Sequence, residues 1–156
     1  MKVSAKSNAD LLALRQRECQ GCLIGGMQVA RRFGCDPEEY GYQMMVLQAI
    51  SWHRWAGDLE KIAAIMVEHY QTFYGFADEL EVCLEDGVLH MTMPSVVRTA
   101  EGQLTHWGAS PEAYRGVQHG IWRAIAERAG FQVDLTLGGR FDTIRVGLPD
   151  GAHADP

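Results

Sequence analysis

The apolar residues of this chain change their spacing near residue 79, and this change constrains the fold more than any other feature. Before it, apolar side chains recur at the three-to-four-residue interval of a helix. From Glu79 to Leu148 the pattern reads as hairpin, helix and hairpin: ELEVCLEDGVLHMTM, ASPEAYRGVQHGIWRAIAERAGF and QVDLTLGGRFDTIRVGL. A sheet with a helix packed across it buries the apolar face of each strand and the apolar face of the helix. We therefore predict an α+β fold in which N-terminal helices pack on a mostly antiparallel sheet built as hairpin–helix–hairpin.

The first hairpin has a predictable register. Asp86-Gly87 is a strong signal for a two-residue turn between strands of alternating character. This turn pairs Leu84 with Leu89, Val82 with Met91 and Leu80 with Met93 on one apolar face. On the opposite face it pairs Cys83 with His90 and Glu81 with Thr92.

Two later segments leave alternatives open. Val96–Trp107 could form a third strand, a turn at Glu101-Gly102 and a short return. In the last hairpin, a two-residue Gly138-Gly139 loop would place Leu135 opposite Asp142. A longer loop would instead match the apolar sets Val133/Leu135/Leu137 and Ile144/Val146/Leu148, and we favour the longer loop.

Three helices are predicted before the sheet. The first is capped by Asp10 and contains Gly21, Gly25 and Gly26, which indicate either close packing or a break. The second and third span Pro37–Ala56 and Leu59–Tyr74. We predict one domain over residues 10–148, a frayed N-terminus over 1–9 and a flexible tail over 149–156.

Composition excludes several classes of function. Lys and Arg number 14 against 20 Asp and Glu, a formal charge of −6, and such an acidic chain is a poor partner for nucleic acid. No run approaches the roughly 18 apolar residues that a membrane span needs. The polar N-terminal residues show no signal peptide, and the four cysteines are irregularly spaced. We therefore predict a cytoplasmic protein with free thiols.

The motif Cys19-Gln20-Gly21-Cys22 falls in the middle of a helical pattern. A redox Cys-x-x-Cys motif stands at a helix N-terminus after a strand, and a zinc site needs further ligands, for which only Cys35 or His53 could serve. We interpret Cys19 and Cys22 as structural thiols, with metal or redox chemistry as the alternative, and predict no metal site.

Cys83 and His90 form the candidate catalytic pair. The predicted register makes them direct cross-strand neighbours, so the imidazole could activate the thiol for acyl or thioester chemistry. The alternative is a half-buried outer sheet face or a dimer surface, because no third orienting residue is evident.

A second set of candidates could bind a ligand. In the helical part these are Trp52, His53, His69 and Tyr70. A histidine among the apolar residues of a helix is either a hydrogen-bonded core residue or an axial ligand to a haem. On the helix after Ser110, the residues Arg115, His119 and Trp122 could form the rim of a site for an anionic or aromatic ligand, or a solvated helix edge. Several methionines suit an adaptable pocket or a simple core.

The run GVQHGIWRAIAERAGFQVD, followed by a short loop and FDTIRV, resembles the C-terminal part of 4-vinyl reductase-type domains. Those are small-molecule-binding domains related to the haem-NO-binding fold, and the resemblance covers about residues 38–148. It implies a small-molecule ligand. A haem or other tetrapyrrole is possible with His53 or His69 as the axial ligand, although the sequence itself requires no cofactor. The family often carries cysteines around the last hairpin, where this chain has Leu137, Gly138 and Asp142, so the family's metal site is not implied here. The order of elements also resembles the aminothiazoline-carboxylate hydrolase-like family, which implies an enzyme.

These observations lead to three hypotheses. The first is a domain, homodimeric by expectation, that binds a small hydrophobic or aromatic ligand between helices and sheet. The second is a cofactor-independent enzyme, a hydrolase, lyase or isomerase, that uses Cys83 and His90 or a buried histidine. The third is an assembly subunit that makes contacts through its acidic surface and Val96–Trp107.

Overall fold

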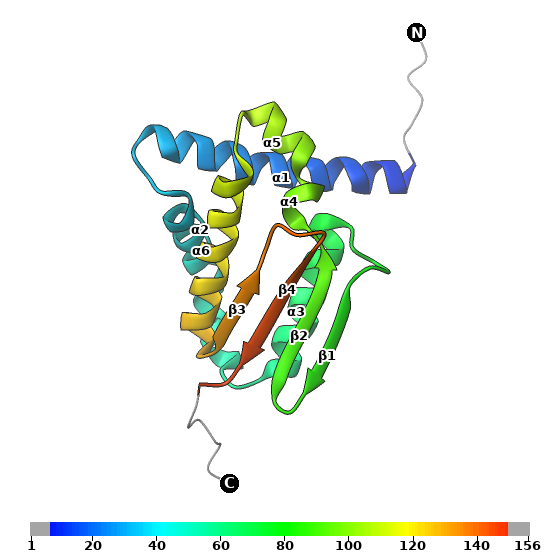
Figure 1. The fold of residues 1–156 in the computed structure, drawn as a ribbon, viewed down its shortest axis with the longest axis vertical. Coiled ribbons are helices and arrows are strands. Elements are labelled where there is room, and N and C mark those ends of the chain that lie inside the picture. The colour runs from blue at the N-terminus through cyan, green and yellow to red at the C-terminus, as the bar shows by residue number, and fades with distance from the viewer. Residues whose placement is uncertain (1–6, 150–156) are drawn as a thin grey trace.

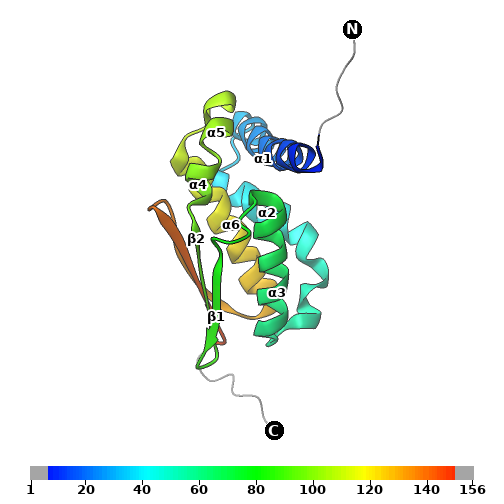
Figure 2. The same ribbon diagram turned by 90° about the vertical axis from the view of Figure 1, so that its right-hand side faces the viewer.

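The computed structural model describes residues 7–149 of the 156-residue chain, except for the side chains of residues 49–51. The predicted frayed end and flexible tail fall mostly on residues 1–6 and 150–156, which lie outside the described residues. The structure has the predicted α+β architecture, with helices on one face of an antiparallel sheet (Figures 1 and 2).

The sheet has four strands in the order β1-β2-β4-β3, and all three pairings are antiparallel. The strands span Glu81–Glu85 (β1), Val88–Pro94 (β2), Gln132–Thr136 (β3) and Phe141–Gly147 (β4). The last strand therefore lies in the middle of the sheet, between β2 and β3, which places the two hairpins side by side.

The longer loop of the last hairpin and the register of the first hairpin are confirmed, except that the predicted Leu80–Met93 pair is not formed because β1 begins at Glu81. In the first hairpin Cys83 pairs with His90 and Leu84 with Leu89, since Asp86 and Gly87 adopt the positive φ angles of 50° and 73° that a tight turn requires. In the second hairpin Leu135 pairs with Ile144, as the longer loop requires. Alternate residues of β2 and β4 are buried against the helices, whereas every residue of the edge strand β1 is exposed.

The helical layer contains the three predicted helices and differs from the prediction in their details. It comprises α1 (Asn8–Arg32), α2 (Pro37–Gln48), a 3-10 helix η1 (Ala49–Trp55), α3 (Leu59–His69), a π-helical turn η2 (Tyr70–Tyr74) and α6 (Pro111–Ala129). The predicted second helix thus ends in a 3-10 segment and the third in a π turn. Figure 2 shows α3 and α6 next to the sheet, while α1 crosses one end of the layer.

The first helix starts earlier than predicted. Ser7, not Asp10, is its N-cap residue: the Ser7 hydroxyl accepts a hydrogen bond from the Asp10 backbone N–H, and the Asp10 carboxylate accepts one from the Ser7 backbone N–H. Asp10 instead occupies the third helical position, where a carboxylate completes a capping box. The prediction of a frayed end over residues 1–9 is therefore wrong for residues 7–9.

Glycines allow helices to approach closely at two places. A Cβ atom on Gly25 would lie 3.2 Å from the Trp107 ring, so α1 continues through its glycines because Trp107 packs on them. Between α2 and α6, a Cβ atom on Gly41 would overlap the backbone of Val117, and one on Gly120 would overlap the backbone of Glu38. These glycines let the backbones of α2 and α6 touch directly.

The alternative of a third strand in Val96–Trp107 is wrong. This segment forms two short helices, α4 (Val96–Thr99) and α5 (Glu101–Trp107). Asp142 of β4, which is 0% exposed, accepts hydrogen bonds from the backbone N–H groups of Val96 and Gly138, each at 2.8 Å. A carboxylate at the first N–H group of α4 favours helix over strand there.

Across the described residues, no helix combines the length and apolar character that a membrane crossing requires.

Candidate functional site

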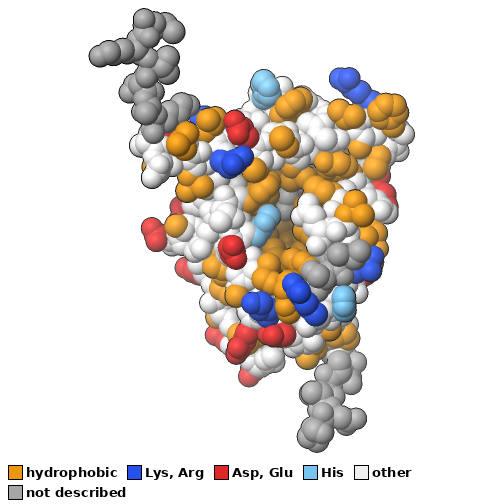
Figure 3. All heavy atoms as spheres, turned by 180° about the vertical axis from the view of Figure 1, so that it is seen from behind, with side chains coloured by type: hydrophobic (Ala, Val, Ile, Leu, Met, Phe, Trp, Pro, Cys, Tyr) orange, Lys and Arg blue, Asp and Glu red, His pale blue; other side chains and the backbone are white. Residues whose placement is uncertain are grey.

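The helices form a chamber, open to solvent, on the side of the molecule that faces away from the open sheet face. Its volume is about 610 Å³, and its walls come from α1, α2, the end of α3 with the π turn, and α6. Figure 3 shows it as a hollow lined by apolar side chains, with a histidine side chain on its wall. The lining combines apolar and aromatic residues (Leu23, Tyr40, Met44, Met45, Phe73, Tyr74, Ile121) with polar ones (Arg15, Glu18, Cys19, Cys22, Gln48, His69, Gln118).

A smaller inner pocket of about 190 Å³ adjoins the chamber. The two share five wall residues: Met45, Gln48, His69, Gln118 and Ile121. The inner pocket adds Trp52, Ile65, Met66, Tyr70 and Trp122, and none of its lining residues is acidic or basic apart from His69. A ligand that fills both spaces would therefore have an apolar, uncharged end next to the two tryptophans.

The π turn places the aromatic side chains of the chamber wall. It adds a residue to the helical turn, and the ring of Tyr74 contacts the rings of both Tyr70 and Phe73. The turn ends at Gly75, whose φ angle of 82° stops the helix. Gln20 of α1 donates a hydrogen bond to the Phe73 carbonyl oxygen at 3.2 Å, which stabilises a backbone geometry that is often found at functional sites.

His69 is the central polar group of the site. Its ring stacks on Phe73 with a centroid distance of 5.2 Å and an interplanar angle of 19°, and it meets Tyr70 edge-on at 5.4 Å. One side of the ring is exposed to the chamber, but the surrounding protein desolvates it, and this burial lowers the pKa of His69 below 6.5. At neutral pH the imidazole is therefore uncharged and offers one donor and one acceptor. Within the described residues no hydrogen bond occupies either ring nitrogen.

A buried hydrogen-bond network supports the wall behind His69. The hydroxyl groups of Tyr74 and Tyr114 lie 2.8 Å apart, and the Gln118 amide donates to Tyr74 at 3.1 Å. The Trp122 indole N–H donates to the Tyr70 hydroxyl at 3.2 Å. Burial raises the pKa of all three tyrosines, so they remain protonated and uncharged. Such a satisfied network fixes the rotamers of the wall before a ligand binds.

Four of the seven predicted ligand-binding residues meet at this site. Trp52, His69, Tyr70 and Trp122 all line the inner pocket, although they come from three separate segments of the chain. His53 is exposed on η1 and does not belong to the lining residues of either space.

Arg115 and His119 lie away from the chamber. Arg115 forms an ion pair with Glu112 at 2.8 Å and contacts the position of Gly138 in the last hairpin loop. His119 is exposed and borders a separate hollow of about 280 Å³ beside β3. Trp122 borders this hollow together with His119, whereas Arg115 is not among its lining residues.

The predicted pair Cys83 and His90 are cross-strand neighbours, on the face of the sheet opposite to the buried Leu89 and Met91. The pKa of the Cys83 thiol is raised, first by desolvation from neighbouring side chains and then by the negative charges of Glu85 and Glu81. A raised pKa lowers the thiolate fraction at neutral pH, which disfavours a nucleophile. Neither Cys83 nor His90 lines any of the four hollows described in this section.

Sequence reasoning missed several wall residues. Gln48 and Gln118 lie on the inner faces of predicted helices, where a polar side chain among apolar ones could have been noticed as a ligand contact. Tyr40 and Tyr74 gave no such signal. The thiols of Cys19 and Cys22, interpreted as structural, both lie on the chamber wall.

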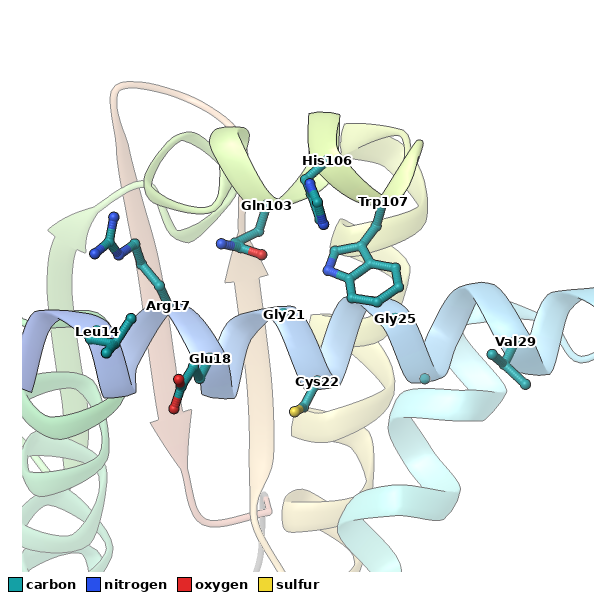
Figure 4. Close-up of a pocket in the computed structure, with 11 residues that line it drawn as sticks. Leu14, Arg17, Glu18, Gly21, Cys22, Gly25, Val29, Gln103, His106 and Trp107 are labelled. Atoms are coloured by element: carbon teal, nitrogen blue, oxygen red, sulfur yellow. The ribbon is translucent and has the colours of Figure 1, made fainter.

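A second hollow, the α1 groove, lies between α1 and α5 (Figure 4). Its volume is about 680 Å³, and it is lined by one side of α1 together with Gln103, His106 and Trp107 of α5. Trp107 remains 44% exposed above the glycines of α1. The groove is more open than the chamber, and its lining residues come from two helices, so we place the candidate site in the chamber.

No three His, Cys, Asp or Glu side chains among residues 7–149 gather closely enough to hold a metal ion.

Searches against protein-family models, curated proteins and solved structures find no match to this chain. The resemblance to 4-vinyl reductase-type domains therefore stays a prediction.

Proposed function

We propose that this protein binds a small hydrophobic or aromatic molecule in the chamber and its inner pocket. One observation carries the proposal: a largely apolar space of about 610 Å³ contains an uncharged histidine whose ring nitrogens make no hydrogen bond to the described residues. Ligand sites are typically cavities of roughly 300–1,000 Å³ with apolar walls and a few well-placed polar groups.

The side chains around His69 favour a flat ligand. Phe73 already stacks on one face of the imidazole, and the tryptophans of the inner pocket offer further ring surfaces. A neutral imidazole can hydrogen-bond a ligand heteroatom or coordinate an iron atom. A tetrapyrrole-like molecule, for which the sequence offers a histidine as axial ligand, belongs to this class, and His69 is the residue that would bind its metal.

The first experiment is a native mass spectrum and a UV–visible spectrum of the protein purified from its own host. Excess mass or a chromophore would identify the ligand, and the same spectrum would test the predicted homodimer. A clean spectrum leaves binding to be tested with a neutral fluorescent probe, N-phenyl-1-naphthylamine.

A matched pair of variants locates that binding. Met44→Trp adds an indole to the chamber wall, whereas Leu47→Trp adds the same group three residues along α2, where the side chain is 76% exposed. We expect Met44→Trp to weaken probe binding by at least about tenfold, equal to about 1.4 kcal/mol, and Leu47→Trp to leave it unchanged. Equal probe affinity in both variants would show that the chamber is not the site.

The alternative is a cofactor-independent enzyme that uses Cys83 and His90. Its support is their cross-strand pairing, which allows the imidazole to contact the thiol. If this alternative holds, Cys83 reacts with iodoacetamide faster than Cys35 at neutral pH. The raised pKa of Cys83 leads us to expect the opposite order.

A further inference from the structure

Cys19 and Cys22 border the same space, and Cys22 also borders the α1 groove. Both residues line the chamber and are three positions apart on α1, so they are neighbours on one side of the helix. At this spacing the Cβ atoms are about 5–6 Å apart. Figure 4 shows the Cys22 thiol pointing away from Trp107 and α5. Both cysteines are free, and neither is fully buried.

Other soft donors line the chamber from different elements. Met44 and Met45 contribute two thioethers from α2. His69 also lines the chamber, but among the described residues it forms no group of three metal-binding side chains with the two cysteines. The cysteines outside the chamber differ: Cys35 donates a hydrogen bond to the Asp36 carbonyl oxygen at 3.5 Å, and Cys83 lies on the outer face of the sheet. The charged groups of the chamber wall are Arg15 and Glu18, one of each sign.

This donor set suits one kind of ion. Thiolates and thioethers select soft ions such as Cu(I), whereas structural zinc needs four tetrahedral ligands. The described residues contain no cluster of three or more His, Cys, Asp or Glu side chains for zinc. Cu(I) has a filled d shell and is satisfied by two thiolates, with a thioether as an optional third ligand.

We propose that Cys19 and Cys22 form a binding site for a soft monovalent metal ion, represented by Cu(I), on the wall of the chamber. Each thiol loses its proton to solvent as its sulfur binds the ion, and the ion keeps its oxidation state. Met44 and Met45 are the thioethers within the same space. This site goes beyond the proposed function and does not depend on it.

The test is an anaerobic titration of the reduced protein with Cu(I) in competition with the chromophoric chelator bicinchoninate. We expect one tightly bound ion per chain. Cys19→Ser and Cys22→Ser should each weaken Cu(I) binding by at least about a hundredfold, because one of the two thiolates is lost. Cys35→Ser and Cys83→Ser are the matched controls and should bind like the parent protein.

Three outcomes would overturn the proposal: no competition with the chelator, unchanged affinity in Cys19→Ser and Cys22→Ser, or an equal loss in the control variants. Far-UV circular dichroism of each variant checks that it is folded. Because Ser is close to Cys in size, we expect every Cys→Ser variant to fold. The probe assay with Met44→Trp reports on the proposed function separately, so failure of one assay does not imply failure of the other.

Discussion

Replacing Asp142 by Asn should destabilise the fold although the two side chains have the same shape. Asp142 is fully buried, and its two carboxylate oxygens accept hydrogen bonds from different backbone N–H groups, Val96 in α4 and Gly138 in the last hairpin loop. An Asn side chain has only one oxygen acceptor, so its NH₂ group must face one of these two N–H donors.

The magnitude follows from opposing contributions. Leaving one buried donor unsatisfied costs about 1–3 kcal/mol, and replacing a charged acceptor by a neutral one weakens the remaining hydrogen bond by about 1 kcal/mol. Removing a buried charge relieves part of its desolvation penalty and offsets some of this loss. We expect a net loss of about 2 kcal/mol in the free energy of unfolding, which for a chain of this length lowers the Tm by about 4–8 °C.

Urea denaturation and differential scanning calorimetry measure this loss. The control is Asp134→Asn, an exposed position on β3, where a change within about 0.5 kcal/mol is expected. If Asp142→Asn also stayed within that range, Asp142 would not hold α4 and the hairpin loop together, and our account of this segment would be refuted.

Two further predictions concern helix packing and pH. Gly120→Ala should destabilise the protein by about 1–3 kcal/mol or more, because the new methyl group meets the Glu38 backbone. Gly102→Ala has no atom within 4 Å of the new methyl group and should stabilise α5 by about 0.5–1 kcal/mol. Urea denaturation of both variants measures these changes. The lowered pKa of His69 means that the unfolded chain binds its proton more readily, so the free energy of unfolding should fall as pH drops below 6.5. A His69→Gln variant should lose this part of the pH dependence, and an unchanged profile would contradict it.

Local chemistry made much of the fold predictable. The Asp86-Gly87 turn sets the register of the first hairpin by itself, because only a two-residue loop with positive φ angles joins strands so tightly. The apolar pairs of the last hairpin selected the longer loop, since the shorter loop would shift the pairing by two residues and place Leu135 opposite Asp142 instead of Ile144. Both depend on residues close together in the sequence.

Long-range contacts decided what local patterns could not. Val96 and Val97 are β-branched and favour a strand, yet the carboxylate of Asp142, 46 residues away from Val96, caps a helix there. In the same way, sequence singled out His69, Tyr70 and Trp122 as ligand-binding candidates without indicating that they share a wall.

The sequence by itself determined the main helices, the pairing within each hairpin and the candidate aromatic residues, because these follow from apolar spacing and turn chemistry within a few residues. Only the tertiary structure decided where the chamber lies and that Cys19 and Cys22 border it together with Met44 and His69. The reason is physical: a cavity is formed by the packing of distant segments, and no local pattern encodes how closely the glycines of α2 and α6 let those helices approach.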